Sequence, residues 1–194
     1  MANKNKVEFG MKMCHIGTYE TDQDGVVTLG EPMHVPGSIS LALSAESEES
    51  KFWADDVVYF SSFTDNGESG DLNMALFPDE FKLAFLNYEQ LADGGIAKIK
   101  TKQNKNVYMI FQGEGDKSKR RHILYNVSLG AISREYRTME GTKEPETETI
   151  PVTLTGDNAT GIVKVSYSEG DAGYDGLFTT PPVPTLPDED PAGV

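Results

Sequence analysis

The sequence predicts a mainly β protein, a β-sandwich or barrel flanked by one short α-helix, and three observations support this. Apolar residues alternate with polar ones over several short segments, which is the period of a half-buried strand. Helical spacing occurs convincingly in one place. The chain has 194 residues, enough for a single domain whose core needs no disulfide or metal.

Alternation places the predicted strands along the chain. The segment VYMIF at 107–111 is apolar at every position, so we expect a central strand buried on both faces. Pro151 cannot donate a ladder hydrogen bond, which indicates an edge or a bulge. Two glycines in 112–122 predict a hairpin connection. Alternating strands are expected at 38–44, 72–76, 122–129, 150–154 and 163–167.

One helix is expected after Pro78, over residues 79–88. Asp79 and Glu80 lie where the helix dipole favours acidic side chains, and the glycine pair at 94–95 follows the expected end. Four apolar residues share one face at the spacing i, i+3, i+4 and i+7: Phe81, Ala84, Phe85 and Tyr88.

We expect one domain over residues 1–168 and a Pro-rich acidic tail over 169–194. The tail has little to pack, so it should be extended or disordered. The net charge of −14 keeps the protein soluble and repels nucleic acid, so tight DNA binding is not expected. No stretch is long and apolar enough for a membrane span. The lone Cys14 is interpreted as a small buried hydrophobe.

No motif indicates catalysis, a cofactor or a metal, so an enzyme is not expected. The segment 115–118 (GDKS) resembles the end of a phosphate-binding loop, but a strand rather than a helix follows it. The segment 22–25 (DQDG) begins like a calcium loop, but Met33 stands where the closing Glu should be. Both are interpreted as hairpin turns. The three histidines have no metal-ligand spacing.

Aromatic and acidic residues alternate after a very polar stretch at 44–50. Interfaces are enriched in Trp, Tyr and Phe, so this pattern favours a contact surface, while an ordinary twisted strand pair in the core is the alternative. The candidates for contact between subunits or stacking of rings are Phe52, Trp53, Asp55, Asp56, Tyr59, Phe60 and Phe63.

Eight of the seventeen basic residues lie within residues 98–121. In an acidic chain the natural acidic partner is a second copy of the chain. A solvated loop and a lysine-blunted strand edge explain the same pattern equally well. The candidates for an electrostatic self-contact are Lys117, Lys119, Arg120 and Arg121.

Three segments in this order and spacing resemble the major tail proteins that build the tail tube of long, non-contractile-tailed bacteriophages, chiefly those of Gram-positive hosts. They are 36–63, 67–81 and 119–127, with 7–10 before them and 147–153 after. This resemblance covers most of residues 7–155.

The resemblance implies a structural virion protein with the β-sandwich of the phage tail-tube type. Such subunits form rings, typically hexameric, whose inner sheets join into one barrel and which stack around a tape-measure protein. The tube meets tail terminator and distal tail proteins, and DNA later passes through its lumen without specific binding. A long loop or hairpin, matched here by 44–66, reaches the adjacent ring. The location implied is the virion tail, and the host cytoplasm during assembly.

A second hypothesis is a monomeric β-sandwich module that binds a carbohydrate or a protein through its aromatic segment. The two hypotheses differ in their expectations. A ring-forming subunit places 52–63 at a contact with another copy and polymerises, whereas a binding module stays monomeric and has a pocket at that segment.

Overall fold

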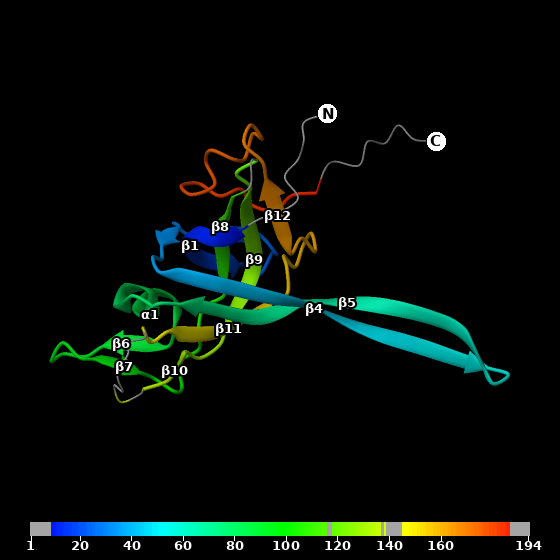
Figure 1. Cartoon of the computed structure of the whole chain (residues 1–194), viewed down its shortest axis with the longest axis horizontal. Helices are drawn as coiled ribbons and strands as arrows, with labels where there is room; N and C mark the ends of the chain where they lie inside the picture. The colour runs from blue at the N-terminus through cyan, green and yellow to red at the C-terminus, as the bar shows by residue number, and fades with distance from the viewer. Residues whose placement is uncertain (1–8, 116–117, 137, 139–144, 187–194) are drawn as a thin grey trace.

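A computed structural model describes residues 9–115, 118–136, 138 and 145–186. In these residues the chain forms twelve strands and one helix (Figure 1). The elements are β1 (Phe9–Thr21), β2 (Val27–Leu29), β3 (Met33–His34), β4 (Ser38–Ala54), β5 (Val57–Met74), α1 (Asp79–Phe85), β6 (Tyr88–Gln90), β7 (Ile96–Lys98), β8 (Val107–Glu114), β9 (Arg121–Leu129), β10 (Ser133–Arg134), β11 (Glu148–Leu154) and β12 (Lys164–Tyr167).

Ten of these strands form one antiparallel sheet, with the order β2-β1-β8-β9-β11-β5-β4. Strand β10 pairs with β11, β12 with β9 and β3 with β1, while β6 and β7 form a separate hairpin. In Figure 1 the strands β4, β5 and β11 cross the direction of β8 and β9. The sheet therefore bends into two layers, and the predicted mainly β architecture with one short helix is confirmed.

Strand β9 makes the corner between the layers. Its first half, through Leu124, pairs with β12, and its last three residues pair with β11. Between the halves Asn126 adopts a positive φ of 50°. Its side-chain nitrogen donates to the Gly156 carbonyl at 2.8 Å, and its side-chain oxygen accepts from Asn106 at 2.9 Å. A bulge held in this way lets one strand serve two differently directed partners.

The apolar core lies in two clusters. The larger one joins the layers and includes Phe81 and Phe85 of α1. The smaller one lies around Tyr108, Ile110 and Tyr125 on the other side of β8 and β9. Strand β8 is therefore buried on both faces, as its apolar run predicts. Cys14 is 1% exposed, and burial raises the pKa of its thiol to about 12, in agreement with its interpretation as a hydrophobe.

The helix is shorter than predicted. It begins after Pro78 with Asp79 and Glu80 in its first turn, but it ends at Phe85. Leu86 is extended, and Tyr88 starts β6 instead of a third helical turn.

A buried carboxylate ties the start of the helix to the sheet. The Glu148 side chain on β11 accepts from the Phe77 N–H at 2.8 Å and lies 3.8 Å from the Lys82 ammonium and 3.6 Å from the Arg134 guanidinium. Because Glu148 is 3% exposed, these groups together compensate its desolvation.

Two expectations about proline-containing segments need correction. Strand β11 is not an edge, because β5 pairs along its whole length and β9 and β10 pair on the other side. On the side of β9 and β10, Pro151 lies in the gap between these two strands, and its carbonyl accepts a hydrogen bond from the Gly130 N–H. Because no ladder bond there needs an N–H from residue 151, proline is tolerated inside the sheet.

The segment from residue 169 is also different from the prediction of an extended or disordered tail. Residues 169–179 form turns, Tyr174 is buried, and Leu177 belongs to the smaller cluster. The Tyr125 hydroxyl donates to the Pro182 carbonyl at 2.8 Å. Leu177, the partly buried Phe178 and this hydrogen bond hold the segment on the sheet. Residues 187–194 of the predicted tail lie outside the described residues.

Candidate assembly interface

A long hairpin arm leaves the body of the molecule (Figure 1). Strands β4 and β5 pair over their whole length, but β11 covers β5 only from Glu68 onward. We call residues 46–66 the arm, because within the described chain its two strands pair only with each other. The predicted projecting segment 44–66 is therefore a two-stranded hairpin, and the backbone hydrogen-bonding groups on both outer edges remain open.

The turn at the end of the arm is a two-residue hairpin connection. Asp55 and Asp56 have φ values of 52° and 59°. Positive φ at both central residues is the type I′ geometry, whose twist matches that of antiparallel strands and which favours Asn, Asp and Gly. The two acidic candidates thus form the tip of the arm.

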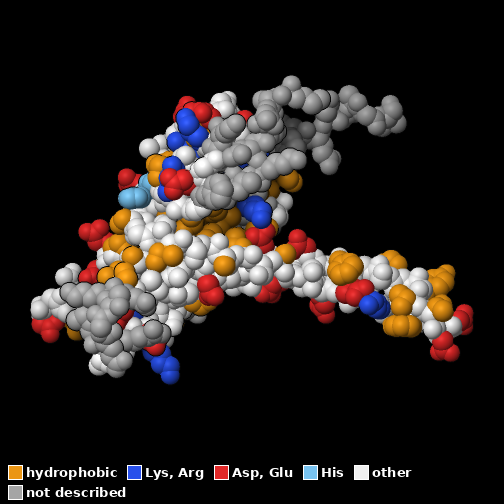
Figure 2. All heavy atoms as spheres, viewed as in Figure 1, with side chains coloured by type: hydrophobic (Ala, Val, Ile, Leu, Met, Phe, Trp, Pro, Cys, Tyr) orange, Lys and Arg blue, Asp and Glu red, His pale blue; other side chains and the backbone are white. Residues whose placement is uncertain are grey.

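The aromatic candidates are all exposed on the arm, so the alternative that they belong to the core is wrong. Tyr59 is 77% exposed and Phe63 is 71% exposed. Figure 2 shows hydrophobic side chains gathered on the outer part of the arm, with acidic ones at its end. Sequence reasoning missed two valines that continue this apolar surface. The exposed large hydrophobic residues of the arm are Phe52, Trp53, Val57, Val58, Tyr59, Phe60 and Phe63.

Both faces of the arm carry apolar side chains. Phe52 lies opposite Phe60, and the adjacent residue Trp53 lies opposite Val58 on the other face. Tyr59 is the extra residue of a bulge between these two pairs. Strands that are apolar on both faces are typical of strands buried on both sides. In the arm, however, these side chains are exposed to solvent on both faces.

A second bulge lies at the root of the arm. Ala45 pairs with Glu68 and Ser47 with Asp65, so two residues of β5 stand opposite Glu46. Gly67 has a φ of 95°, and its N–H donates to the Asp65 carboxylate at 3.0 Å. A Cβ at Gly67 would collide with the carbonyl oxygen of Leu154. Glycine is required there, and the bulge sets the direction in which the arm leaves the body.

The basic candidates lie at the far end of β8 and β9, apart from the arm. Lys119 is exposed and pairs with Glu169 at 2.8 Å, which raises its pKa. The Arg121 guanidinium stacks on Tyr174 with 3.9 Å to the ring centroid. Both residues thus hold the segment after residue 168 to the sheet. Arg120 is half-buried, and Lys117 lies outside the described residues. Their contact with a second copy stays a prediction.

The DQDG segment, interpreted as a turn, forms one. The Asp22 carboxylate accepts from the N–H groups of Asp24 and Val26 and closes the connection between β1 and β2. The GDKS segment joins β8 to β9, and its residues 116–117 lie outside the described residues. Among the residues that the structure describes, no group of His, Cys, Asp and Glu is arranged to hold a metal ion. In the same residues, no helix has the length and hydropathy needed to cross a membrane.

Comparison with known proteins adds no family. No protein-family model matches the chain, and no curated protein matches it. The arm, its tip and its root are therefore the features from which a function is inferred.

Proposed function

We propose that this protein is a self-assembling structural subunit, and specifically a subunit of the tail tube of a bacteriophage with a long, non-contractile tail. The observation that carries the proposal is the arm, which presents seven large hydrophobic side chains to solvent. Exposed apolar patches of this kind mark surfaces that bind another macromolecule.

The physics of an isolated hairpin supports this proposal. A two-stranded hairpin is marginally stable in water, and long, apolar open edges invite uncontrolled pairing. Natural proteins cover or pair such edges. A neighbouring subunit that receives the arm buries its aromatic side chains and satisfies its open backbone groups in one step.

The direction of the arm favours an open-ended assembly. Its tip lies at one end of the molecule, and α1 with the β6–β7 hairpin lies at the opposite end (Figure 1). A contact between an arm and the distant end of another copy joins two different surfaces. Contacts of this heterologous type produce rings when they close and filaments when they do not. A tube of stacked rings needs contacts that close within each ring and contacts that stay open along the axis of the tube.

The more detailed parts of the proposal rest on the resemblance of the sequence. The subunit forms rings around a tape-measure protein, and the resemblance implies six copies in each ring. Tail terminator and distal tail proteins complete the tube, which is located in the virion tail after assembly in the host cytoplasm. The net charge of −14 supports a lumen through which DNA slides without binding, because like charges repel.

The rival hypothesis of a monomeric binding module has less support. Such a module needs a concave site at its aromatic segment, since binding sites are clefts that enclose most of a ligand. The aromatic segment instead forms a convex, two-sided projection.

Electron microscopy of the concentrated protein, together with its mass from light scattering, tests the proposed function. We expect rings or tubes of uniform width for the natural sequence. The double variant Trp53→Glu, Tyr59→Glu should remain folded and monomeric, because charges on the arm oppose its burial. Val183→Glu is the matched control, since Val183 is 43% exposed in the segment after β12, outside both the arm and the end formed by α1 and the β6–β7 hairpin.

Two results contradict the proposal. A natural protein that stays monomeric near 21.2 kDa at every concentration favours the binding module instead. Normal tubes from the double variant show that the arm is not the contact.

A further inference from the structure

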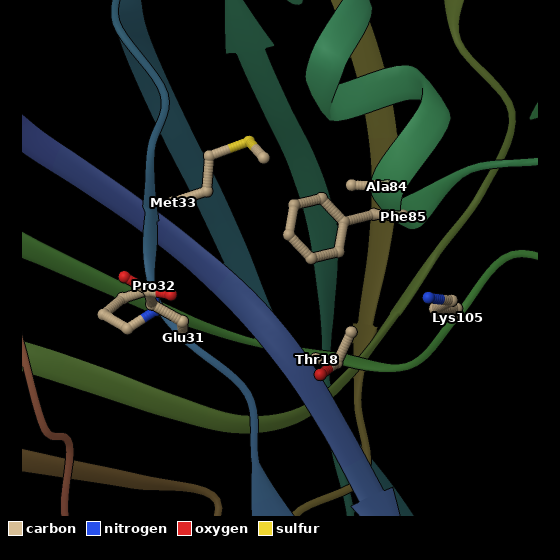
Figure 3. Close-up of a pocket in the computed structure, with 7 residues that line it drawn as sticks. All are labelled: Thr18, Glu31, Pro32, Met33, Ala84, Phe85 and Lys105. Carbon is tan, nitrogen blue, oxygen red and sulfur yellow. The ribbon is translucent and has the colours of Figure 1, made fainter.

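A pocket opens at the end of the molecule opposite the arm tip (Figure 3). Its volume is about 450 Å³, and its walls come from the β2–β3 connection, the last turn of α1 and the loop before β8. Pockets of about 300–1,000 Å³ hold ligands with several rings, so an aromatic side chain fits. The residues that matter here are Glu31, Pro32, Met33, Ala84, Phe85 and Lys105.

The pocket combines apolar walls with one charge of each sign. Met33 and Phe85 supply apolar surface, and in Figure 3 Glu31 and Lys105 lie on opposite sides of it. The Lys105 ammonium forms no ion pair with a described residue, although its backbone N–H donates to the Phe85 carbonyl at 2.9 Å. The site therefore offers an unused cation, an acceptor and apolar walls.

The tip of the arm has the complementary set of groups. Asp55 and Asp56 supply negative charge, and no described cation pairs with either side chain. Trp53 is 61% exposed and carries an indole N–H donor, and Val57 is 58% exposed. Each feature of the pocket thus has a counterpart within a few residues of the turn.

We propose that this pocket is the receptor for the arm tip of a second copy of the chain. The apolar side chains beside the turn enter the pocket, the aspartates face Lys105, and Glu31 accepts a hydrogen bond from the arm. This inference rests on the proposed function and adds to it the place where the arm docks. Because pocket and tip lie at opposite ends, one copy can donate its arm and receive another at the same time.

Charge variants test the electrostatic part of this docking. Lys105→Glu should raise the critical concentration for assembly about tenfold at low salt, because it replaces the pocket's lysine with a second acid beside Glu31, facing the acidic tip. The matched control is Lys100→Glu, since Lys100 is exposed in the same loop but does not line the pocket. This control should change the critical concentration by less than about twofold.

Combining Lys105→Glu with an arm tip that carries no charge tests whether Lys105 and the tip interact directly. The double variant Asp55→Asn, Asp56→Gly keeps the residues preferred in a type I′ turn and removes both charges. In this background Lys105→Glu should raise the critical concentration for assembly only about twofold, because the tip no longer carries the negative charges that would repel the new glutamate. An equal cost in both backgrounds overturns the pairing of Lys105 with the tip.

A filled pocket tests the apolar part without a change of charge. Ala84→Phe places a ring in the pocket and should abolish assembly, whereas Leu83→Phe, one residue earlier on α1, should not. Melting temperatures check that both variants fold. If Ala84→Phe does not fold, the charge variants of the exposed residues Lys105 and Lys100 still test the docking site.

The two proposals fail in different ways. If no copy assembles, the proposed function and the inference are both wrong. If the Trp53→Glu, Tyr59→Glu variant loses assembly while Lys105→Glu and Ala84→Phe assemble normally, the arm is a contact but this pocket is not its receptor.

Discussion

Strands β4 and β5 each pass through two contrasting regions, the body of the sandwich and the arm. On β5, Leu72 is completely buried in the body, and Phe63, nine positions earlier, is 71% exposed in the arm. Both positions are apolar and both are paired to β4. The second layer of the same chain covers Leu72, whereas solvent surrounds Phe63.

This difference separates two uses of the same secondary structure. In the body, every second residue of β11 is buried, and β8 is buried on both faces. In the arm, apolar side chains occupy both faces and polar residues fill the stretch before them. The body is therefore stabilised within one chain, whereas the arm is suited to burial between chains.

The largest expected effect on stability comes from truncating the body residue of this pair. Leu72→Ala should lower the free energy of unfolding by about 2–5 kcal/mol, because it leaves a cavity in the larger cluster. Phe63→Ala should change it by less than about 0.5 kcal/mol, since the ring is already in water. Urea denaturation measures both. Equal costs would mean that the arm folds back onto the body in solution.

A smaller effect is expected at the root of the arm, where the two regions meet. Gly67→Ala should cost about 1–3 kcal/mol, because alanine resists a φ of 95° and its Cβ meets the Leu154 carbonyl. Gly94→Ala is the control for strain alone, since Gly94 has a φ of 89° and no atom near the added Cβ. If both variants lose the same stability in thermal denaturation, the contact with Leu154 does not matter.

The smallest effect concerns a buried ionised group, which the body has and the arm lacks. Burial disfavours the charge on Asp157, but hydrogen bonds from Thr160 and Tyr19 outweigh it and lower the pKa of this carboxyl below its ordinary value of 3.8. Asp157→Asn should cost about 0.5–1.5 kcal/mol at neutral pH, because one accepted hydrogen bond is lost.

The sign of the pH dependence follows from this lowered pKa. A carboxyl with a depressed folded-state pKa contributes stability above pH 3.8 and loses it as the pH falls through the folded value. The difference in free energy of unfolding between the natural protein and Asp157→Asn should therefore become smaller below pH 3.8. Urea denaturation of both proteins at pH 7 and at several values below pH 4 measures this difference. A difference that stays constant with pH contradicts a stabilising role for the Asp157 charge.

Much of the fold could be predicted from local patterns. The alternation at 150–154 and the apolar run at 107–111 gave the positions of β11 and β8, and Pro78 with the acids after it marked the start of α1. The end of the helix could not be predicted, because Tyr88 has helical spacing but pairs with Lys98 in β7. The docking of the segment after residue 168 depends on Arg121, which is distant in sequence.

The candidate interface divides in the same way. The seven aromatic and acidic candidates were found from composition, but their exposure and their division between two faces depend on the pairing register of β4 and β5. The pocket residues gave no signal in the sequence, since Glu31, Ala84 and Lys105 come together only when three separate elements meet.

The sequence by itself determined the strand-rich class, the start of the helix, the turn residues and the acidic charge, because periodicity, backbone preference and charge are local properties. Only the tertiary structure decided which strand segments are covered. Burial depends on how many layers a sheet has at each point, and β5 is covered where β11 and the second layer reach it. On the other side of Gly67, β4 is its one remaining strand partner among the described residues, and there the arm begins.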